Sequence, residues 1–148
     1  MSTTNETNYE KMWEDFGETK SATYLEYKFT PTHRVGLTNH LRERKIYEYL
    51  KPNKDQSVAD IGCAAGRQLV KLSPRIGEGV GTDIASSFVA TARTYAKEHG
   101  LTNLSFEHAP VETLPFPDNK FDAVICAEVL EHVLDKDAAL KERLRITT

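Results

Sequence analysis

Cysteine, long apolar runs and an excess of one charge are all scarce in this 148-residue sequence. Its 2 cysteines, Cys63 and Cys126, form no CxxC motif and are too few for a disulfide framework or a zinc knuckle, so free thiols are expected. The 8 glycines and 6 prolines exclude a collagen-like or low-complexity chain. The longest apolar run, residues 123–127, is far shorter than the roughly 20 residues that a membrane-spanning helix requires.

The charge balance and the first residues exclude further classes of protein. The sequence has 19 Lys and Arg against 22 Asp and Glu, a net charge of -3, which argues against a uniformly basic nucleic-acid-binding surface. Residues 1–16 are polar and acidic, whereas a secretory signal begins with basic and then apolar residues. We therefore expect a cytoplasmic protein with no membrane or nucleic-acid partner.

The part of the chain before residue 57 predicts two helices. Three aromatic residues at i, i+4 and i+7 would share one face of a short helix: Tyr9, Trp13 and Phe16. A second helical pattern ends at Pro52. Its expected inward residues are Leu37, Leu41, Ile46 and Leu50, and its expected solvent-facing residues are Arg42, Arg44 and Lys45. We interpret residues 1–56 as a helical flank or lid.

From Ser57 onward, short apolar strands alternate with helical patterns. Strands are expected at residues 58–61, 78–83, 103–109 and 121–127, and helices after Gly66, from Ser86 and over 135–145. Ser86 and Ser87 are expected to cap one helix, and Leu140 and Leu144 to face inward from another. This alternation predicts an α/β fold with a mostly parallel sheet, in which ligands bind at the carboxyl ends of the strands.

The loop after the first strand carries the first chemical signal. Gly62, Ala64 and Gly66 are small enough for a ligand to approach the backbone, although a tight turn alone would also explain them. Asp83 follows Gly62 by about 20 residues, the spacing of the acidic residue that binds a ribose in dinucleotide-type folds. Asp60 would repel a pyrophosphate but attract an ammonium group. The pattern therefore favours a nucleoside with an amino-acid tail over a nicotinamide dinucleotide.

Four segments in order resemble class I S-adenosylmethionine-dependent methyltransferases, in particular the small-molecule branch related to quinone-ring methyltransferases. They are residues 58–67 (VADIGCAAGR), 80–84, 114–122 (LPFPDNKFD) and 127–133 (AEVLEHV). The resemblance implies a Rossmann-like doubly wound sheet with strand order 3-2-1-4 and S-adenosyl-L-methionine as the cofactor. It also implies a small organic molecule as the methyl acceptor.

The resemblance also implies site residues. Those expected around the methionine moiety are Asp60, Gly62, Cys63 and Gly66; those expected around the nucleoside are Asp83 on the ribose, Ile84 against the adenine, and Val111 and Glu112 beside the base. Ala127 and Glu128 are expected beneath the sulfonium. One position departs from the family pattern, because Pro110 stands where relatives commonly have an acidic residue that holds the adenine amino group.

Two interpretations stay open for the other candidate residues. His132 is a candidate general base for the acceptor, or a histidine that only fixes the turn into the next helix. Either Glu128 or Glu131 is expected to line the pocket while the other is solvated. Tyr9, Trp13 and Phe16 would form an aromatic lid or pack in the core. The remaining histidines, at positions 33, 40, 99 and 108, have no metal-ligand spacing, so no metal site is expected.

The strand count adds an expectation about completeness. Only four strands fit into residues 57–148, whereas the resembled fold continues with further strands, so we expect a C-terminally truncated cofactor-binding domain. Its fourth strand would be an exposed edge that favours self-association. Two alternatives to an active methyltransferase remain: a cofactor-binding fragment or pseudoenzyme without turnover, and a nicotinamide-dependent dehydrogenase, which Asp60 and the glycine spacing disfavour.

Overall fold

The computed structural model describes residues 3–29 and 34–148. The elements, in chain order, are α1 (Thr3–Phe29), α2 (Arg34–Leu50), β1 (Ser57–Ile61), α3 (Arg67–Leu72), the short 3-10 helix η1 (Ser73–Arg75), β2 (Glu78–Asp83), α4 (Ser86–Glu98), β3 (Leu104–His108), β4 (Ala123–Ile125) and α5 (Lys136–Ile146). Strands alternate with helices after α2, so the predicted α/β class is confirmed. In the described part of the chain, no helix combines the length and apolarity that crossing a membrane requires.

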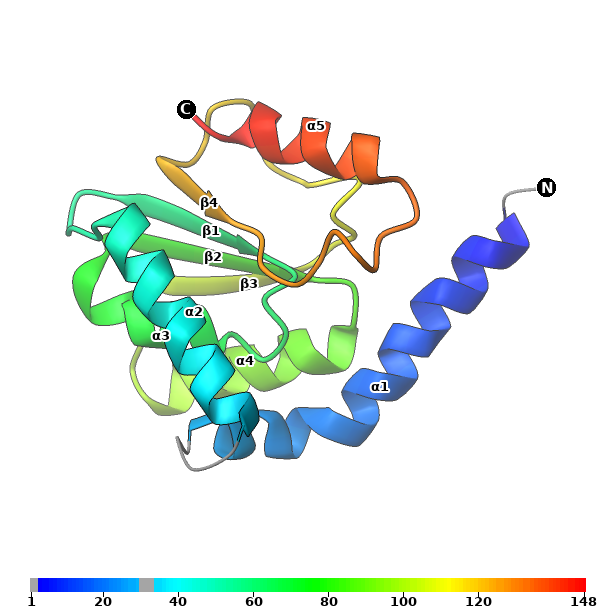
Figure 1. The fold of residues 1–148 in the computed structure, drawn as a ribbon, viewed down its shortest axis with the longest axis horizontal. Helices are drawn as coiled ribbons and strands as arrows, with labels where there is room; N and C mark the ends of the chain where they lie inside the picture. The colour runs from blue at the N-terminus through cyan, green and yellow to red at the C-terminus, as the bar shows by residue number, and fades with distance from the viewer. Residues whose placement is uncertain (1–2, 30–33) are drawn as a thin grey trace.

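The four strands form one parallel sheet in the order β3-β2-β1-β4, which confirms the predicted order 3-2-1-4. β1 is central, with Asp60 in register with Gly81 of β2 and with Ile125 of β4. In Figure 1, α5 covers one face of the sheet, whereas α2, α3 and α4 cover the other. The carboxyl ends of all four strands therefore meet at one edge, where α1 also passes.

The two central strands, β1 and β2, are buried on both faces, as strands of parallel sheets usually are, whereas the edge strand β3 is exposed on one face. On the α3 and α4 face, Val58 and Leu69 are fully buried in one apolar cluster. On the α5 face, Ala59 and Phe121 belong to a second cluster. Because successive residues of a strand point to opposite faces, Asp60 lies on the same side as Val58, which is the side of α2 and α3. The alternation along β1 thus fixes which helices can reach this carboxylate.

Helix α2 corrects one prediction from the sequence. Leu37 and Leu41 are 55% and 50% exposed, so they do not face inward. The inward face instead carries Asn39 and Glu43, each 5% exposed, followed by the half-buried Ile46. These residues follow one another at helical spacing, and Leu50 packs against the core as well. The helix and its inward residues Ile46 and Leu50 were therefore predicted correctly, whereas the inward positions of Leu37 and Leu41 were wrong. The polar side chains face inward because the edge of the sheet beside α2 is itself polar.

The cap of α4 is also different from the prediction. Neither Ser86 nor Ser87 provides a side-chain cap for α4. The carboxylate of Glu14 on α1 accepts hydrogen bonds from the Ser86 N–H at 2.7 Å, the Ser86 hydroxyl at 2.7 Å and the Ser87 N–H at 3.1 Å. A carboxylate at this position suits the partial positive charge of a helix N-terminus. Glu14 therefore joins α1 to the sheet domain by capping α4 from a distance in sequence.

Replacing Glu14 with glutamine is expected to loosen α1. The amide keeps the size of the side chain but loses the charge that the α4 N-terminus attracts, at a cost of about 0.5–1 kcal/mol. Amide hydrogens of α1 should exchange faster in Glu14→Gln, as measured by hydrogen-exchange mass spectrometry. The neighbouring exposed residue Asp15 offers the control, and equal exchange in Asp15→Asn and Glu14→Gln would contradict the capping role.

At the β4 edge of the sheet, the last residues of the chain return to the start of the strand. The Phe121 N–H donates to the Ile146 carbonyl at 2.9 Å, and the Thr148 N–H donates to the Phe121 carbonyl at 3.0 Å, so Phe121 and Thr147 form a parallel bridge. β4 itself is shorter than predicted because only residues 123–125 pair with β1. Self-association through this edge stays a prediction.

Helix α5 packs with a different side chain than the leucine spacing predicted. Leu144 is 68% exposed, whereas Ala139 and Ile146 are fully buried. Ile146→Val should therefore lower the free energy of unfolding by about 0.5–1.5 kcal/mol. Leu144→Ala should change it by less than about 0.5 kcal/mol. Urea denaturation of both variants measures the difference, and a larger loss for Leu144→Ala would contradict this packing.

Candidate functional site

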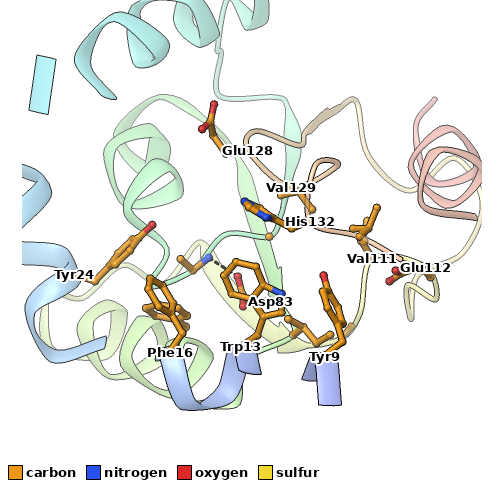
Figure 2. A pocket seen from close by; sticks show the side chains of 16 residues that line it. Tyr9, Trp13, Phe16, Tyr24, Asp83, Val111, Glu112, Glu128, Val129 and His132 are labelled. Carbon is orange, nitrogen blue, oxygen red and sulfur yellow. Dashed lines mark hydrogen bonds between the residues drawn. The ribbon is translucent and has the colours of Figure 1, made fainter. Parts of the chain in front are cut away.

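Two adjoining cavities open at the carboxyl edge of the sheet. The first, here called the aromatic cavity, is lined by Tyr9, Trp13, Phe16, Tyr24 and Phe88 together with Asp83 (Figure 2). The second, here called the polar cavity, is lined by Asn39, Arg42, Asp60, Cys63, Arg67 and Gln68, among others. Tyr24, Gly62, Ala64 and Glu128 line both cavities. The two cavities therefore adjoin, one mainly apolar and the other charged, and together they are called the cleft here.

The loop between β1 and α3 shapes the boundary of this cleft. Its backbone takes left-handed conformations at Gly62 (φ 73°), Ala64 (φ 47°) and Gly66 (φ 77°). The N–H groups of Gly62 and Cys63 both donate to the Thr82 carbonyl at 2.8 Å, which joins the loop to β2. A side chain at position 62 would collide with Val129. Gly62 is thus required both by its conformation and by the close approach of Val129.

Gly66 has a purely structural environment. A Cβ atom there would lie 2.6 Å from the Phe106 ring on β3 and 3.1 Å from Ala92 on α4. Gly66 precedes α3 as its N-cap residue and lines neither cavity. Close packing thus explains a glycine at position 66, whereas Gly62 lines both cavities; the predicted role of Gly66 at the cofactor stays a prediction.

Asp83 ends β2 and connects the loop to α4. Its Oδ2 accepts a hydrogen bond from the Ala64 N–H at 2.7 Å, and its Oδ1 accepts one from the Ala85 N–H at 2.9 Å. Burial raises the pKa of this carboxyl, and the two backbone N–H groups partly offset that rise. Each carboxylate oxygen has a second lone pair, so the group retains acceptor capacity toward a ligand in the aromatic cavity.

Asp60 lies beneath the loop in the polar cavity and is 5% exposed. Burial, and then the nearby charge of Asp83, raises the pKa of Asp60 to about 7. The carboxylate is thus poorly solvated and would gain from a positively charged partner. Burial also raises the pKa of the neighbouring Cys63 thiol well above its usual value, so this cysteine stays protonated and is a poor nucleophile.

Helix α1 contributes the aromatic wall. The Trp13 ring lies edge-on to the His132 ring, with centroids 5.1 Å apart and planes at 69°. Trp13 also contacts Phe16 edge-on at 5.7 Å, and Phe16 meets Phe88 of α4 at 6.0 Å. Figure 2 shows Tyr9 and Trp13 rising from α1 toward Asp83 and His132. These side chains line a cavity instead of filling a closed core, which favours the interpretation as a lid.

Most of the residues predicted from the sequence line the cleft. In the aromatic cavity are Gly62, Asp83, Ile84, Val111, Glu112, Glu128 and His132, and in the polar cavity are Asp60, Gly62, Cys63, Ala127 and Glu128. Of the two glutamates left open, both are exposed, but Glu128 lines both cavities and Glu131 lines neither. Pro110 lies at a third hollow, beside Tyr9 and Glu112.

Several residues at the cleft were not predicted. Tyr24, Phe88 and Val129 add apolar surface to the aromatic cavity, and Asn39 and Gln68 add amides to the polar one. Arg42 was predicted to be solvated, but its side chain is 31% exposed, lines the polar cavity and pairs with Glu128 at 3.1 Å. The signal available in the sequence was Asn39 and Glu43, two polar residues one helical turn apart, on the face that leads to Ile46.

Within the described residues, no group of three or more His, Cys, Asp or Glu side chains is arranged to hold a metal ion. His33 lies outside the described residues. His99 stacks on Tyr95 with centroids 3.9 Å apart, and the His108 ring bonds to the Ile84 carbonyl at 2.8 Å. Both of these histidines thus have structural partners.

The sequence model of a family described as "Methyltransferase domain" matches residues 59–148, which include the whole sheet after the first residues of β1. The chain belongs to this methyltransferase family. Two curated relatives of the family are similar to the same region. One is the uncharacterized methyltransferase YcgJ of Bacillus subtilis, 35% identical over 92 residues. The other is the ubiquinone/menaquinone biosynthesis C-methyltransferase UbiE of Hahella chejuensis, 40% identical over 94 residues.

Solved structures agree with this family assignment. The crystal structure of YcgJ superposes with a TM-score of 0.71 at 30% identity, over 74% of this chain and 47% of that one. The crystal structure of the [4+2]-cyclase SpnF gives a TM-score of 0.68 at 26% identity, over 72% of this chain and 40% of that one. The matched sequence regions are 62% of this chain but 36% of YcgJ, and 61% of this chain but 38% of UbiE. The chain thus spans well under half the length of these relatives.

Proposed function

We propose that the protein binds S-adenosyl-L-methionine in the cleft, across the two adjoining cavities, and transfers its methyl group to a small organic acceptor. The observation that carries the proposal is the arrangement of two carboxylates around one glycine loop. Asp83 faces the apolar cavity, and the buried Asp60 faces the polar one. A ligand with a nucleoside at one end and an ammonium group at the other matches this distribution of apolar and charged groups.

The residues of the cleft suit the chemical groups of the cofactor. In the proposed arrangement, Asp83 accepts hydrogen bonds from the ribose hydroxyls, and Ile84, Val111 and Glu112 border the adenine. Asp60, Gly62 and Cys63 surround the methionine moiety, and Ala127 with Glu128 lie beneath the sulfonium. Gly66 has a supporting role, because it holds α3 against β3 and lines neither cavity. Pro110 has no side-chain acceptor, so a backbone carbonyl or a neighbouring residue holds the adenine amino group.

The cofactor, when bound, supplies an activated methyl group, so the protein contributes mainly position and exclusion of water. The aromatic residues of α1 line the same cavity as Gly62 and Asp83 and would limit the access of water to it. An acceptor hydroxyl, amine or acidic carbon also needs a base to take its proton. In our proposal this base is His132, which lines the cavity opposite Trp13. The second interpretation of His132 is a residue that fixes the turn; the backbone N–H of position 132 donates to the Val129 carbonyl at 2.8 Å.

The experiment that tests this function measures methyl transfer directly. The protein is incubated with S-adenosylmethionine and a panel of phenols, quinols and amines, and formation of S-adenosylhomocysteine is followed by mass spectrometry. Quinols belong in the panel because the relative UbiE carries a ubiquinone and menaquinone C-methyltransferase name. Turnover with one class, slowed at least tenfold in His132→Gln, supports the proposal. Turnover unchanged in His132→Gln assigns this histidine to the turn alone.

A second candidate function is cofactor binding without methyl transfer. The observation behind this candidate is the likeness to SpnF at 26% identity. SpnF is named as a [4+2]-cyclase, so a protein with this fold need not be named as a methyltransferase. This candidate predicts that S-adenosylhomocysteine binds tightly while every acceptor in the panel stays unmethylated.

A further inference from the structure

The segment between β3 and β4 depends on a distant helix for its conformation. Three prolines within residues 110–117 lack a backbone N–H, so this segment cannot form a regular hydrogen-bond ladder. The Thr113 N–H donates to the Pro110 carbonyl at 3.3 Å, which closes one turn. After this turn, backbone groups of Leu114 and Phe116 bond to side chains of α5, which lie 28 to 31 residues further along the chain. The position of the segment is therefore set from α5.

The α5 side chains that hold this segment form one bidentate ion pair. Arg145 Nε lies 2.7 Å from Glu142 Oε1, and Arg145 Nη2 lies 2.8 Å from Glu142 Oε2. Glu142 Oε2 also accepts a hydrogen bond from the Leu114 N–H at 2.8 Å. Arg145 donates to the Leu114 carbonyl at 3.1 Å and to the Phe116 carbonyl at 2.6 Å, and it also pairs with Asp118, which is 70% exposed. The pair thus bonds to the backbone at two positions of a segment that has no ladder.

The ion pair lies away from the cleft, whereas the segment that it holds borders the cleft. Glu142 and Arg145 line neither of the two cavities nor the third hollow. Val111 and Glu112 line the aromatic cavity, and Glu112 also lines the third hollow. Leu114 is 5% exposed and belongs to the same apolar cluster as Val111. Because both backbone groups of Leu114 are bonded to the pair, and buried side chains are close-packed, a change at the pair is transmitted to Val111.

We propose that the Glu142–Arg145 pair positions the base of the cofactor by holding residues 110–116 in the conformation that places Val111 and Glu112 beside the adenine. This inference rests on the proposed function, in which these two residues border the base. Neither member of the pair contacts the ligand, so both are positioning residues. A planar guanidinium can bind one carboxylate and two carbonyls at once in fixed directions, which an ammonium group cannot do. The protein should therefore distinguish adenine from other purines only while the pair is intact.

Two ligands that differ only in the base test this role. S-adenosylhomocysteine has an amino group at position 6 of the purine, and S-inosylhomocysteine has an oxygen there. Titration calorimetry with the unmodified full chain should show roughly tenfold tighter binding of S-adenosylhomocysteine. In Arg145→Gln, S-adenosylhomocysteine should bind about fivefold more weakly, and its advantage over S-inosylhomocysteine should fall to about twofold. Equal affinity of the unmodified chain for the two ligands overturns the inference but leaves the proposed function intact. Absence of binding for both ligands overturns both.

An equal loss for both ligands in Arg145→Gln, with the preference for adenine unchanged, would indicate a merely structural role and contradict the inference. Lys141→Gln is the matched control, because Lys141 is exposed on the same helix and lines none of the three hollows. It removes the same charge as Arg145→Gln. Both affinities in Lys141→Gln should stay within about twofold of the unmodified chain.

A second variant tests the same role if Arg145→Gln does not fold. Glu142→Gln keeps the size of the side chain, and its amide oxygen can still accept from the Leu114 N–H, but it loses the charge that binds Arg145. The same fall in the preference for adenine is expected. Hydrogen-exchange mass spectrometry of the ligand-free chains gives a readout that does not depend on binding. Amide hydrogens of residues 111–114 should exchange faster in Glu142→Gln than in Lys141→Gln, and equal exchange would contradict the inference.

Discussion

Replacing Asp83 with alanine is expected to weaken binding of S-adenosylhomocysteine by about 10- to 100-fold, as for the loss of hydrogen bonds to a charged group. The variant loses the proposed contacts to the ribose hydroxyls. It also loses the bonds that Asp83 accepts from the Ala64 N–H at 2.7 Å and the Ala85 N–H at 2.9 Å. Because Ala64 lies in the glycine loop, the shape of the cleft depends on the same carboxylate. Titration calorimetry measures the change in affinity.

The control for Asp83→Ala is Glu107→Ala. Glu107 is an exposed carboxylate on the neighbouring strand β3, in register with Thr82, and it lines neither cavity. Glu107→Ala changes the net charge by the same amount as Asp83→Ala, one register position away in the neighbouring strand. Affinity in Glu107→Ala should stay within twofold of the unmodified protein. A comparable loss in both variants would mean that general electrostatics, and not the position of Asp83, governs binding.

Replacing Asp60 with asparagine is expected to stabilise the ligand-free protein at alkaline pH. The pKa of Asp60 in the folded protein is about 7, against an ordinary value of 3.8, so the folded state holds this proton more tightly than the unfolded state does. The stability contributed by the protonated carboxyl is complete below about pH 4 and is lost as the pH rises through 7. With about 1.4 kcal/mol for each pKa unit, the rise from 3.8 to about 7 means that the ionised carboxylate costs roughly 4 kcal/mol at pH 8.

Urea denaturation at several pH values tests the Asp60 prediction. The free energy of unfolding of Asp60→Asn should exceed that of the unmodified protein at pH 8, and the difference should shrink toward pH 4. The same variant should bind S-adenosylhomocysteine more weakly, because the amide no longer attracts the ammonium group. Higher stability together with weaker ligand binding is expected when a residue contributes to binding at a cost in folding free energy. A variant less stable than the unmodified protein at pH 8 would contradict the account.

The central part of the fold could be predicted from short-range patterns. β1 and β2 were predicted nearly to the residue, because their apolar residues are buried on both faces and glycines bound them. The position of Asp83 at the cleft follows from the same pattern, since the carboxyl ends of parallel strands meet at one edge. A motif that lies wholly on one strand and the loop after it can thus be recognised from the sequence without knowing how the helices pack.

The contributions of α1 and α2 could not be predicted in this way. The side chains of Leu37 and Leu41 resemble a core-facing stripe, yet Asn39 and Glu43 face inward instead. Helical spacing identifies two possible faces, and the choice depends on what lies opposite. Here the opposite surface is polar, with Arg67 and Asp60, and it is formed by residues distant in sequence. The capping of α4 by Glu14 could not be predicted either, because Glu14 and Ser86 are far apart in the sequence.

The account's central claim is that the cleft around Gly62, Asp60 and Asp83 binds S-adenosylmethionine and its demethylated product. Titration calorimetry of the full chain with S-adenosylhomocysteine, with NADH as the comparison ligand, tests this claim most directly. We expect S-adenosylhomocysteine to bind one-to-one with a dissociation constant well below millimolar, and we expect no binding of NADH. Absence of S-adenosylhomocysteine binding at millimolar concentration, or preferential binding of NADH, would contradict it.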